Sequence, residues 1–159
     1  DVEWYEMRNP NNRTRGTYLR ENWEPIQDQV TTFSEYINVI PEIQMIHTSG
    51  HSNGHSIILL KQGKDTMIHM GDLMLSHVHR NPLWVPAVDD YPMKSILAKD
   101  KWLRQAFENH YKFFFYHDQF FAVAEFDKEG KEFVDYVLRS RPPLIPFTDQ
   151  QDRKPVFLG

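Results

Sequence analysis

The stretch SIILLKQGKDTMIHMGD, residues 56–72, restricts the fold more than any other part of the sequence. Two runs of mostly aliphatic residues, 56–60 and 66–70, stand on either side of the turn-forming letters KQGKD. This arrangement is typical of a β-hairpin, because a Gly-containing turn can join two antiparallel strands. We therefore predict a hairpin whose second strand ends at Gly71 and Asp72.

Further strands and helices are predicted on both sides of this hairpin. INVIPEIQMIH predicts two short strands separated by Pro41, KFFFYHD predicts a buried strand that ends at His117, and AVAEFDKEGKEFVDYVL predicts a second hairpin. MKSILAKDKWLRQAFENHY carries its apolar residues on one stripe, as an amphipathic helix does. TYLRENWEPIQDQVTTF has a weaker helical pattern that Pro25 should interrupt. Together these segments predict an α/β (α+β) fold with a mixed sheet and flanking helices.

Three histidines, His47, His51 and His55, recur at four-residue intervals. This spacing would align them on one face of a helix, as in some zinc sites. Gly50 and Gly54 argue against a helix, because each glycine costs about 1 kcal/mol in a helix interior. We therefore predict a strand, a loop and a strand, with His51 in the loop.

Candidate metal ligands follow three of the predicted strands. His51, Asp72 and His117 each come at or just after a strand end, where open α/β sheets tend to bind ligands. A single histidine is more often a structural or surface residue, so the prediction depends on the three together. His47 and His69 are interpreted as such structural residues.

Composition excludes several classes of protein. A net charge of −4 gives no basic surface for nucleic acid, and no apolar run approaches the roughly 18 residues of a membrane helix. The absence of cysteine excludes a disulfide scaffold and fits a reducing compartment. A cytoplasmic location is the default expectation, and the charge and hydropathy predict contact with neither nucleic acid nor membrane. We expect residues 1–159 to form a single domain with a loosely structured, Pro-rich tail over 139–159.

The motifs HTSGHSNGHSIILL, HMGD and FFFYHD together resemble the carboxyl-terminal half of hydrolases of the metallo-β-lactamase superfamily. The pattern of that superfamily is T-x-G-H-x-x-G-H, then G-D, then a late His. The stretch HRNPLWVPAVDDYP is similar to the quorum-quenching N-acyl homoserine lactonase branch. The resemblance covers residues 1–131 and implies half of a four-layer αβ/βα fold, so the chain is expected to be the carboxyl-terminal part of a longer domain.

By this resemblance, His51 would be a terminal ligand of one of two divalent metal ions, for which zinc is the expected element. Asp72 would bridge both ions, His117 would bind the second, and His55 would support the ligands through hydrogen bonds. The implied reaction is opening of a lactone ring, such as that of an acyl-homoserine lactone, by a hydroxide shared between the metals. It requires the amino-terminal half of the protein.

The sequence departs from the superfamily in two places. The signature H-x-H-x-D-H, which supplies most of the ligands, does not occur in the 159 residues. Several acyl-homoserine lactonases carry a Tyr three residues after the bridging Asp, where this chain has Leu75. His77 and His79 are the nearest replacements as catalytic residues beside Asp72, and the alternative is that both are ordinary loop residues.

The residues that would bind the substrate are predicted from the same loop. Met74, Trp84 and Tyr91 could line an apolar pocket for the acyl chain of a small lactone or ester, with core packing as the alternative. Other functions stay open: a phosphotriesterase or aryl esterase of the same superfamily, or a non-catalytic metal-binding fragment. The chain could also pair with a separate amino-terminal half or form a homo-oligomer through an exposed sheet face.

Overall fold

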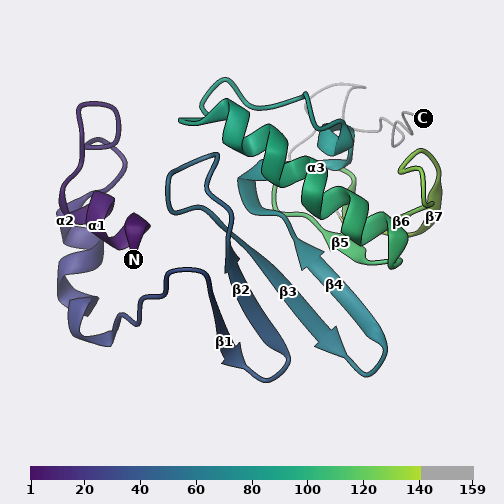
Figure 1. Cartoon of the computed structure of the whole chain (residues 1–159), viewed down its shortest axis with the longest axis horizontal. Coiled ribbons are helices and arrows are strands. Elements are labelled where there is room, and N and C mark those ends of the chain that lie inside the picture. The colour runs from purple at the N-terminus through teal and green to yellow at the C-terminus, as the bar shows by residue number, and fades with distance from the viewer. Residues whose placement is uncertain (141–159) are drawn as a thin grey trace.

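A seven-stranded mixed sheet runs through the molecule in the order β1 to β7 (Figure 1). This computed structural model describes residues 1–140. The strands are β1 (Tyr36–Ile40), β2 (Ile43–His47), β3 (Ser56–Gln62), β4 (Asp65–His69), β5 (Lys112–Phe114), β6 (Phe121–Phe126) and β7 (Phe133–Leu138). Neighbouring strands are antiparallel except β4 and β5, which are parallel because helix α3 (Pro92–Glu108) connects them. The predicted mixed sheet with flanking helices is confirmed.

The predicted hairpin of residues 56–72 is the pair β3 and β4. Its strands are longer at the turn than predicted, since Gln62 pairs with Asp65 and leaves a two-residue turn. Ile57 and Leu59 on β3 and Ile68 on β4 are buried, while their neighbours are more exposed. This alternation follows from the period of two residues in a strand, and it directs one face of the hairpin toward α3.

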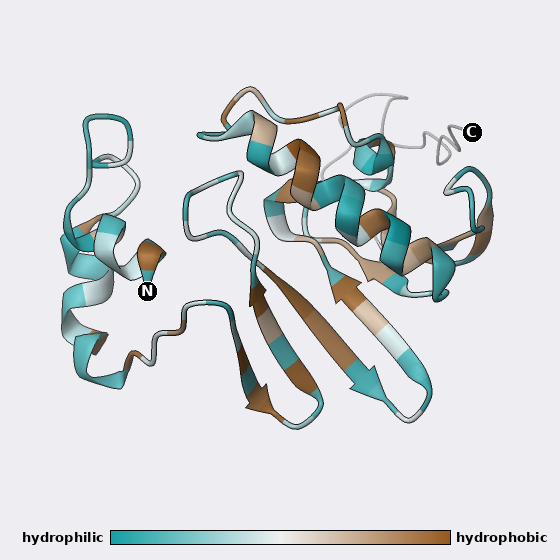
Figure 2. Ribbon diagram, viewed as in Figure 1, coloured by the Kyte–Doolittle hydropathy of each residue, from teal (hydrophilic) through white to brown (hydrophobic). Residues whose placement is uncertain are grey.

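Helix α3 covers one face of the sheet (Figure 1). Its buried residues Leu103, Ala106 and Phe107 join Phe113 and Phe126 from the strands in a single core. Figure 2 shows the apolar stripe of the helix and the apolar strands beneath it. Burial of each large apolar side chain stabilises the fold by about 1.5–3 kcal/mol, so this packing holds the strand ends that carry the candidate ligands.

A helical region precedes the sheet and lies beside the loop between β2 and β3 (Figure 1). This N-terminal segment, residues 1–34, contains α1 (Val2–Arg8), α2 (Arg20–Trp23) and the 3₁₀-helix η1 (Glu24–Gln29). Pro25 stands in the first turn of η1, so it interrupts the helical pattern as predicted. Helix α1 was not predicted, because its short sequence has no buried residue and no clear period.

The predicted strand KFFFYHD ends earlier than expected. Strand β5 stops at Phe114, three residues before His117. The carboxylate of Asp118 accepts hydrogen bonds from the backbone N–H groups of Phe120 and Phe121, so the chain turns here instead of continuing the strand. His117 therefore lies in a turn and not at the last position of a strand.

The connecting segment after β4 contains the 3₁₀-helices η2 (Gly71–Leu73) and η3 (His77–Arg80). Of the predicted tail 139–159, residues 141–159 lie outside the described part of the chain. Arg139 is held at the sheet, since its backbone N–H donates to Phe120 O and its Nε to Asp118 O. In residues 1–140, the longest helix falls short of the length and apolarity that membrane crossing requires.

Candidate metal centre

The carboxylate of Asp72 stands between two histidines. Its Oδ2 lies 3.4 Å from His51 Nε2, and its Oδ1 lies 3.3 Å from His117 Nε2. Both separations exceed the usual 2.7–3.2 Å of a hydrogen bond and match the roughly 3.4 Å between two ligands of one tetrahedral zinc ion. The structure thus brings together the three ligands predicted from the sequence, with one oxygen of Asp72 directed to each histidine.

The ring of His51 is oriented by Asp89. His51 Nδ1–H donates to Asp89 Oδ1 at 2.9 Å, and the Asp89 side chain is almost completely buried. A carboxylate can only accept, so this bond places the proton on Nδ1 and leaves the lone pair of Nε2 facing Asp72. Metal-binding histidines are commonly held in this way by a carboxylate.

A buried cation lies behind Asp89. Lys99 on α3 is fully buried and donates from Nζ to the carbonyl of Trp84. Burial lowers the pKa of Lys99 to about 8, while the charge of Asp89 acts in the opposite direction. The ammonium of Lys99 therefore lies close enough to the Asp89 carboxylate for the two opposite charges to interact.

His55 supports Asp72 through the backbone. Its Nε2 accepts the N–H of Asp72 at 3.1 Å, and its Nδ1 bonds to Thr48 Oγ1 at 2.8 Å. Burial lowers the pKa of His55 to about 4, with the nearby His51 acting in the same direction. The ring is therefore neutral at pH 7, and its Nε2 is occupied by the Asp72 amide instead of pointing to a metal.

Gly71 makes this close approach possible. Its φ of 55° lies in the left-handed region, and a Cβ there would stand 2.5 Å from His55 Nε2. Any larger residue would push His55 away from Asp72 as well as strain the backbone. The occurrence of Gly followed by Asp in the HMGD motif is thus explained. Glycine allows His55 to approach the backbone of Asp72, and aspartate supplies the carboxylate oxygens.

The described residues supply only part of a metal centre. Within residues 1–140, no three or more His, Asp or Glu side chains converge so as to hold a metal ion. Each oxygen of Asp72 has one histidine beside it, which gives two ligands on each side where a tetrahedral zinc site takes four. These three side chains fit part of a centre in which two metal ions share Asp72. They do not supply enough ligands for either metal ion.

The two histidines predicted as replacements for the missing Tyr have other contacts. His77 is buried, its Nδ1 lies 2.6 Å from Asp118 Oδ2, and its ring packs on Phe121 and Phe133. His79 Nδ1 bonds to Ser76 Oγ at 2.9 Å, and burial lowers the pKa of His79. These contacts place His77 in the core and give no support to a catalytic role for either residue.

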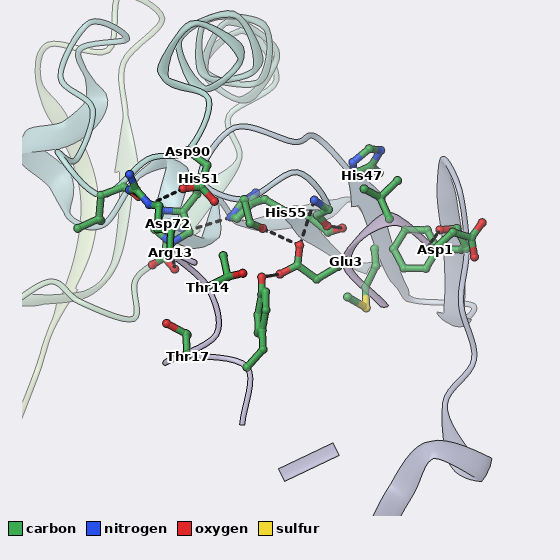
Figure 3. Close-up of a pocket in the computed structure, with 18 of the residues that line it drawn as sticks. Asp1, Glu3, Arg13, Thr14, Thr17, His47, His51, His55, Asp72 and Asp90 are labelled. Carbon is green, nitrogen blue, oxygen red and sulfur yellow. Dashed lines mark hydrogen bonds and ion pairs between the residues drawn. The ribbon is translucent and has the colours of Figure 1, made fainter. Parts of the chain in front are cut away.

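A cavity of about 700 Å³ opens beside His51, His55 and Asp72 (Figure 3). None of the three predicted substrate-binding residues is among those that line it. Met74 is buried in the core, whereas Trp84 and Tyr91 are exposed, so the structure does not bring them together at the candidate site. The reason is that Met74 follows η2 into the core, while Trp84 and Tyr91 lie on the outer side of the 81–91 loop.

His47 and His69 have local hydrogen bonds. His47 Nε2 lies 2.8 Å from Asn53 O, and His69 Nδ1 accepts the N–H of Gly71 at 3.1 Å. Burial lowers the pKa of His69, whose ring packs on Phe114. Both sets of contacts fit the interpretation that these residues are structural.

Asp89 is the site residue that sequence reasoning missed. It lies in the loop segment VPAVDDYP, in which the sequence predicted only Tyr91 as a site residue. An acidic pair in a long loop that follows a predicted metal motif was an available signal, because ligating histidines need carboxylate or carbonyl partners. The sequence does not say which of Asp89 and Asp90 turns inward.

Three of the solved structures to which this chain is similar illustrate the likeness. A probable metal-dependent hydrolase from Staphylococcus aureus is 36% identical with a TM-score of 0.85, over 89% of this chain and 51% of that one. The hydrolase AbOPH of the β-lactamase superfamily is 20% identical with a TM-score of 0.60, over 91% of this chain and 50% of the other. AidC, a dizinc quorum-quenching lactonase in complex with a product, is 16% identical with a TM-score of 0.59, over 84% and 49%.

The structure is therefore part of a metallo-β-lactamase fold, which confirms the fold class predicted from the sequence. The chains to which it is similar are metal-dependent hydrolases of that superfamily, and acyl-homoserine lactone lactonases are among them, so the predicted resemblance is confirmed as well. The chain spans about half the length of these solved structures. Neither a family model nor a curated protein matches the sequence.

Proposed function

We propose that the complete protein is a metal-dependent hydrolase that opens the lactone ring of acyl-homoserine lactones. One observation carries the proposal: the carboxylate of Asp72 directs one oxygen toward His51 and the other toward His117, at 3.4 and 3.3 Å. The likeness to lactonases and to a metal-dependent hydrolase supports it. The geometry at Asp72 and the likeness to metal-dependent hydrolases support metal-dependent hydrolysis as the class of reaction. The choice of a lactone as the substrate is a more specific proposal.

His51, Asp72 and His117 would hold two divalent cations, with zinc the expected element because His and carboxylate ligands suit it. Such cations supply an activated water near neutral pH and polarise an ester carbonyl. The remaining residues act on the ligands: Asp89 fixes the tautomer of His51, and His55 fixes the backbone of Asp72. A cytoplasmic location and a role in quorum quenching belong to the same proposal.

The test uses the complete protein and three variants. Asp72→Ala and His51→Ala are each expected to lower bound metal, measured by elemental analysis, together with hydrolysis of an acyl-homoserine lactone. His110→Ala is the control, because His110 is half exposed and pairs with Glu125 away from the site. Full metal content and full activity in the Asp72 variant would contradict the proposal.

A substrate panel separates the lactonase from its relatives. Lactones, aryl esters and phosphotriesters are compared by kcat/KM, since one two-metal site can serve all three reactions. A clear preference for lactones supports the proposal, while a preference for phosphotriesters or aryl esters replaces it with the alternative hydrolase. Bound metal without any hydrolysis identifies a non-catalytic metal-binding protein.

A further inference from the structure

A lysine is buried in helix α3, close to the carboxylate that binds His51. The side chain of Lys99 is fully buried, although lysine side chains are almost never buried unless they are paired. Burial lowers the pKa of Lys99 to about 8, so most molecules carry its positive charge at pH 7. The surroundings of Lys99 therefore accommodate a cation in the interior of the protein.

The ammonium of Lys99 holds the 81–91 loop near its start. Its Nζ donates a hydrogen bond to the backbone carbonyl of Trp84, whose own side chain is about half exposed. An ammonium has three hydrogens, so this bond does not use its whole hydrogen-bonding capacity. The contact attaches the backbone of the loop, and not the indole ring, to α3.

The other end of this loop is bonded to the loop that carries His51. The backbone N–H of Asp90 donates to His51 O at 3.0 Å, and the next N–H, of Tyr91, donates at 2.9 Å to the carbonyl of the preceding residue, Gly50. Helix α3 meets the same point, since a Cβ on Gly50 would stand 2.6 Å from the Oγ of Ser95, about one helical turn before the buried lysine. Both ends of the loop are therefore fixed, one of them by the lysine.

Asp89 belongs to the same loop and places its carboxylate in the interior. Its Oδ1 accepts the Nδ1–H of His51 at 2.9 Å, while its Oδ2 is buried and has no hydrogen-bond partner within residues 1–140. A buried carboxylate with an unused oxygen is costly unless an opposite charge compensates it. The charge of Lys99 interacts with that of Asp89 and so offsets part of this cost.

We propose that Lys99 is a positioning residue for His51. It anchors the 81–91 loop and supplies the positive charge near which the Asp89 carboxylate stays in the interior, and Asp89 in turn keeps the proton of His51 on Nδ1. The Nε2 atom of His51 then carries the lone pair that faces Asp72. The inference rests on the proposed function in that a metal ion uses this lone pair.

The first test is a double-mutant cycle for zinc affinity in the complete protein. Lys99→Met keeps most of the side-chain volume and removes the charge, so zinc binding should weaken about tenfold, measured by competition with a chromogenic chelator. Added to Asp89→Asn, the same substitution should lower the affinity little further, because the carboxylate through which Lys99 acts is already replaced by a neutral group. An equal loss in both backgrounds would give Lys99 a merely structural role and overturn the proposal.

A spectroscopic measurement reports on His51 in the metal-free complete protein. The nitrogen NMR signals of its imidazole should show the proton on Nδ1 in the wild type. In Lys99→Met, signals of the tautomer that is protonated on Nε2 should appear. Lys101→Met is the matched control, because Lys101 is an exposed lysine on the same helix, and it should change neither the tautomer nor the zinc affinity.

The two measurements separate this inference from the proposed function. If the complete protein binds no zinc or hydrolyses no lactone, the proposed function fails. A tautomer change that Lys99→Met causes in the wild type but not in Asp89→Asn would still support the positioning role. A wild-type tautomer in folded Lys99→Met protein would overturn that role, whatever the reaction.

If Lys99→Met does not fold, the double variant Lys99→Met/Asp89→Asn decides. Loss of one partner of a buried pair of charges is strongly destabilising, whereas replacement of both by neutral side chains often costs little. Recovery of folding in the double variant, followed by circular dichroism, would support the compensation of Asp89 by Lys99. An unfolded double variant beside a folded Asp89→Asn protein would overturn it.

Discussion

Two buried aspartates, Asp89 and Asp118, each bind a histidine, and the two pairs have different roles. Asp118 binds His77 and also accepts backbone N–H groups of Phe120 and Phe121, so its oxygens are used within the fold. Asp89 binds His51 through Oδ1, while its buried Oδ2 has no hydrogen-bond partner among residues 1–140. The first pair stabilises a turn, and the second directs a histidine nitrogen toward Asp72.

Asp89→Asn should weaken metal binding without unfolding the protein. The substitution keeps the shape but removes the negative charge that holds the proton on His51 Nδ1, so zinc affinity of the complete protein is expected to fall about 10–100-fold. Competition with a chromogenic chelator measures this affinity. Asp100→Asn, at an exposed pair with Arg104, is the control, and equal affinities in the two variants would contradict the assigned role.

Asp118→Ala should reduce the free energy of unfolding by about 3 kcal/mol, because it leaves His77 buried without its carboxylate. Burial raises the pKa of Asp118, but the hydrogen bonds from His77, Phe120 and Phe121 outweigh it and lower the pKa to about 2. A lowered pKa gives stability that is present above the ordinary value of 3.8 and is lost as the pH falls toward 2. Urea unfolding of wild type and variant should therefore differ most near neutral pH and converge in acid.

At the scale of elements, the loop between β2 and β3 depends on a close fit to α1. A Cβ on Gly54 would stand 2.4 Å from the backbone nitrogen of Glu3 and 2.6 Å from its Cα. Real Cβ atoms do not approach a backbone so closely, so the helix or the loop would have to move. The same loop contains His51, and its position is thus coupled to α1.

Gly54→Ala should destabilise the protein by about 1–3 kcal/mol and loosen the N-terminal segment. Thermal unfolding measures the first effect, and proteolysis within residues 1–34 measures the second. Gly16→Ala is the control, because nothing lies within 4 Å of a Cβ built at Gly16. Equal stability and protease resistance of the two variants would show that the contact with Glu3 is unimportant.

The sequence predicted those elements that have a strong internal period. The hairpin β3–β4 and helix α3 could be recognised because their apolar residues alternate or form a stripe over many residues. Helix α1 could not be recognised, because contacts distant in sequence, such as the bond between Glu3 and Gly54, position it. The early end of β5 could not be recognised either, because it depends on the turn that the Asp118 carboxylate stabilises. The ligands His51, Asp72 and His117 follow glycine-containing motifs, whereas Asp89 becomes significant only through its contact with His51.

At the scale of the whole molecule, β1 forms one edge of the sheet and exposes apolar side chains. Tyr36, Val39 and Ile40 are each about half exposed, on a strand that pairs with β2 alone among residues 1–140. Edge strands with apolar side chains tend to pair with other chains. An association of this chain with an amino-terminal half or with a second copy, which we propose, has a candidate surface here.

Val39→Lys should reduce association of the 159-residue chain, because a charge on an edge strand opposes pairing. Light scattering at increasing protein concentration gives the apparent mass. Lys64→Arg, in the turn between β3 and β4, is a control that keeps the charge. Identical concentration dependence in wild type and the Val39 variant would exclude β1 as the contact surface.

The attachment of the N-terminal segment also has a consequence for the order of folding. Arg13 bonds to the carbonyl of Val88 across 75 positions of the chain, and Gly54 bonds to Glu3 across 51. Contacts so distant in sequence carry a large loop-closure entropy and form after local hairpins. During refolding, the amide of Gly54 should therefore gain protection from hydrogen exchange later than the amides of β3. The loop that carries His51 is thus expected to be among the last parts of the molecule to form.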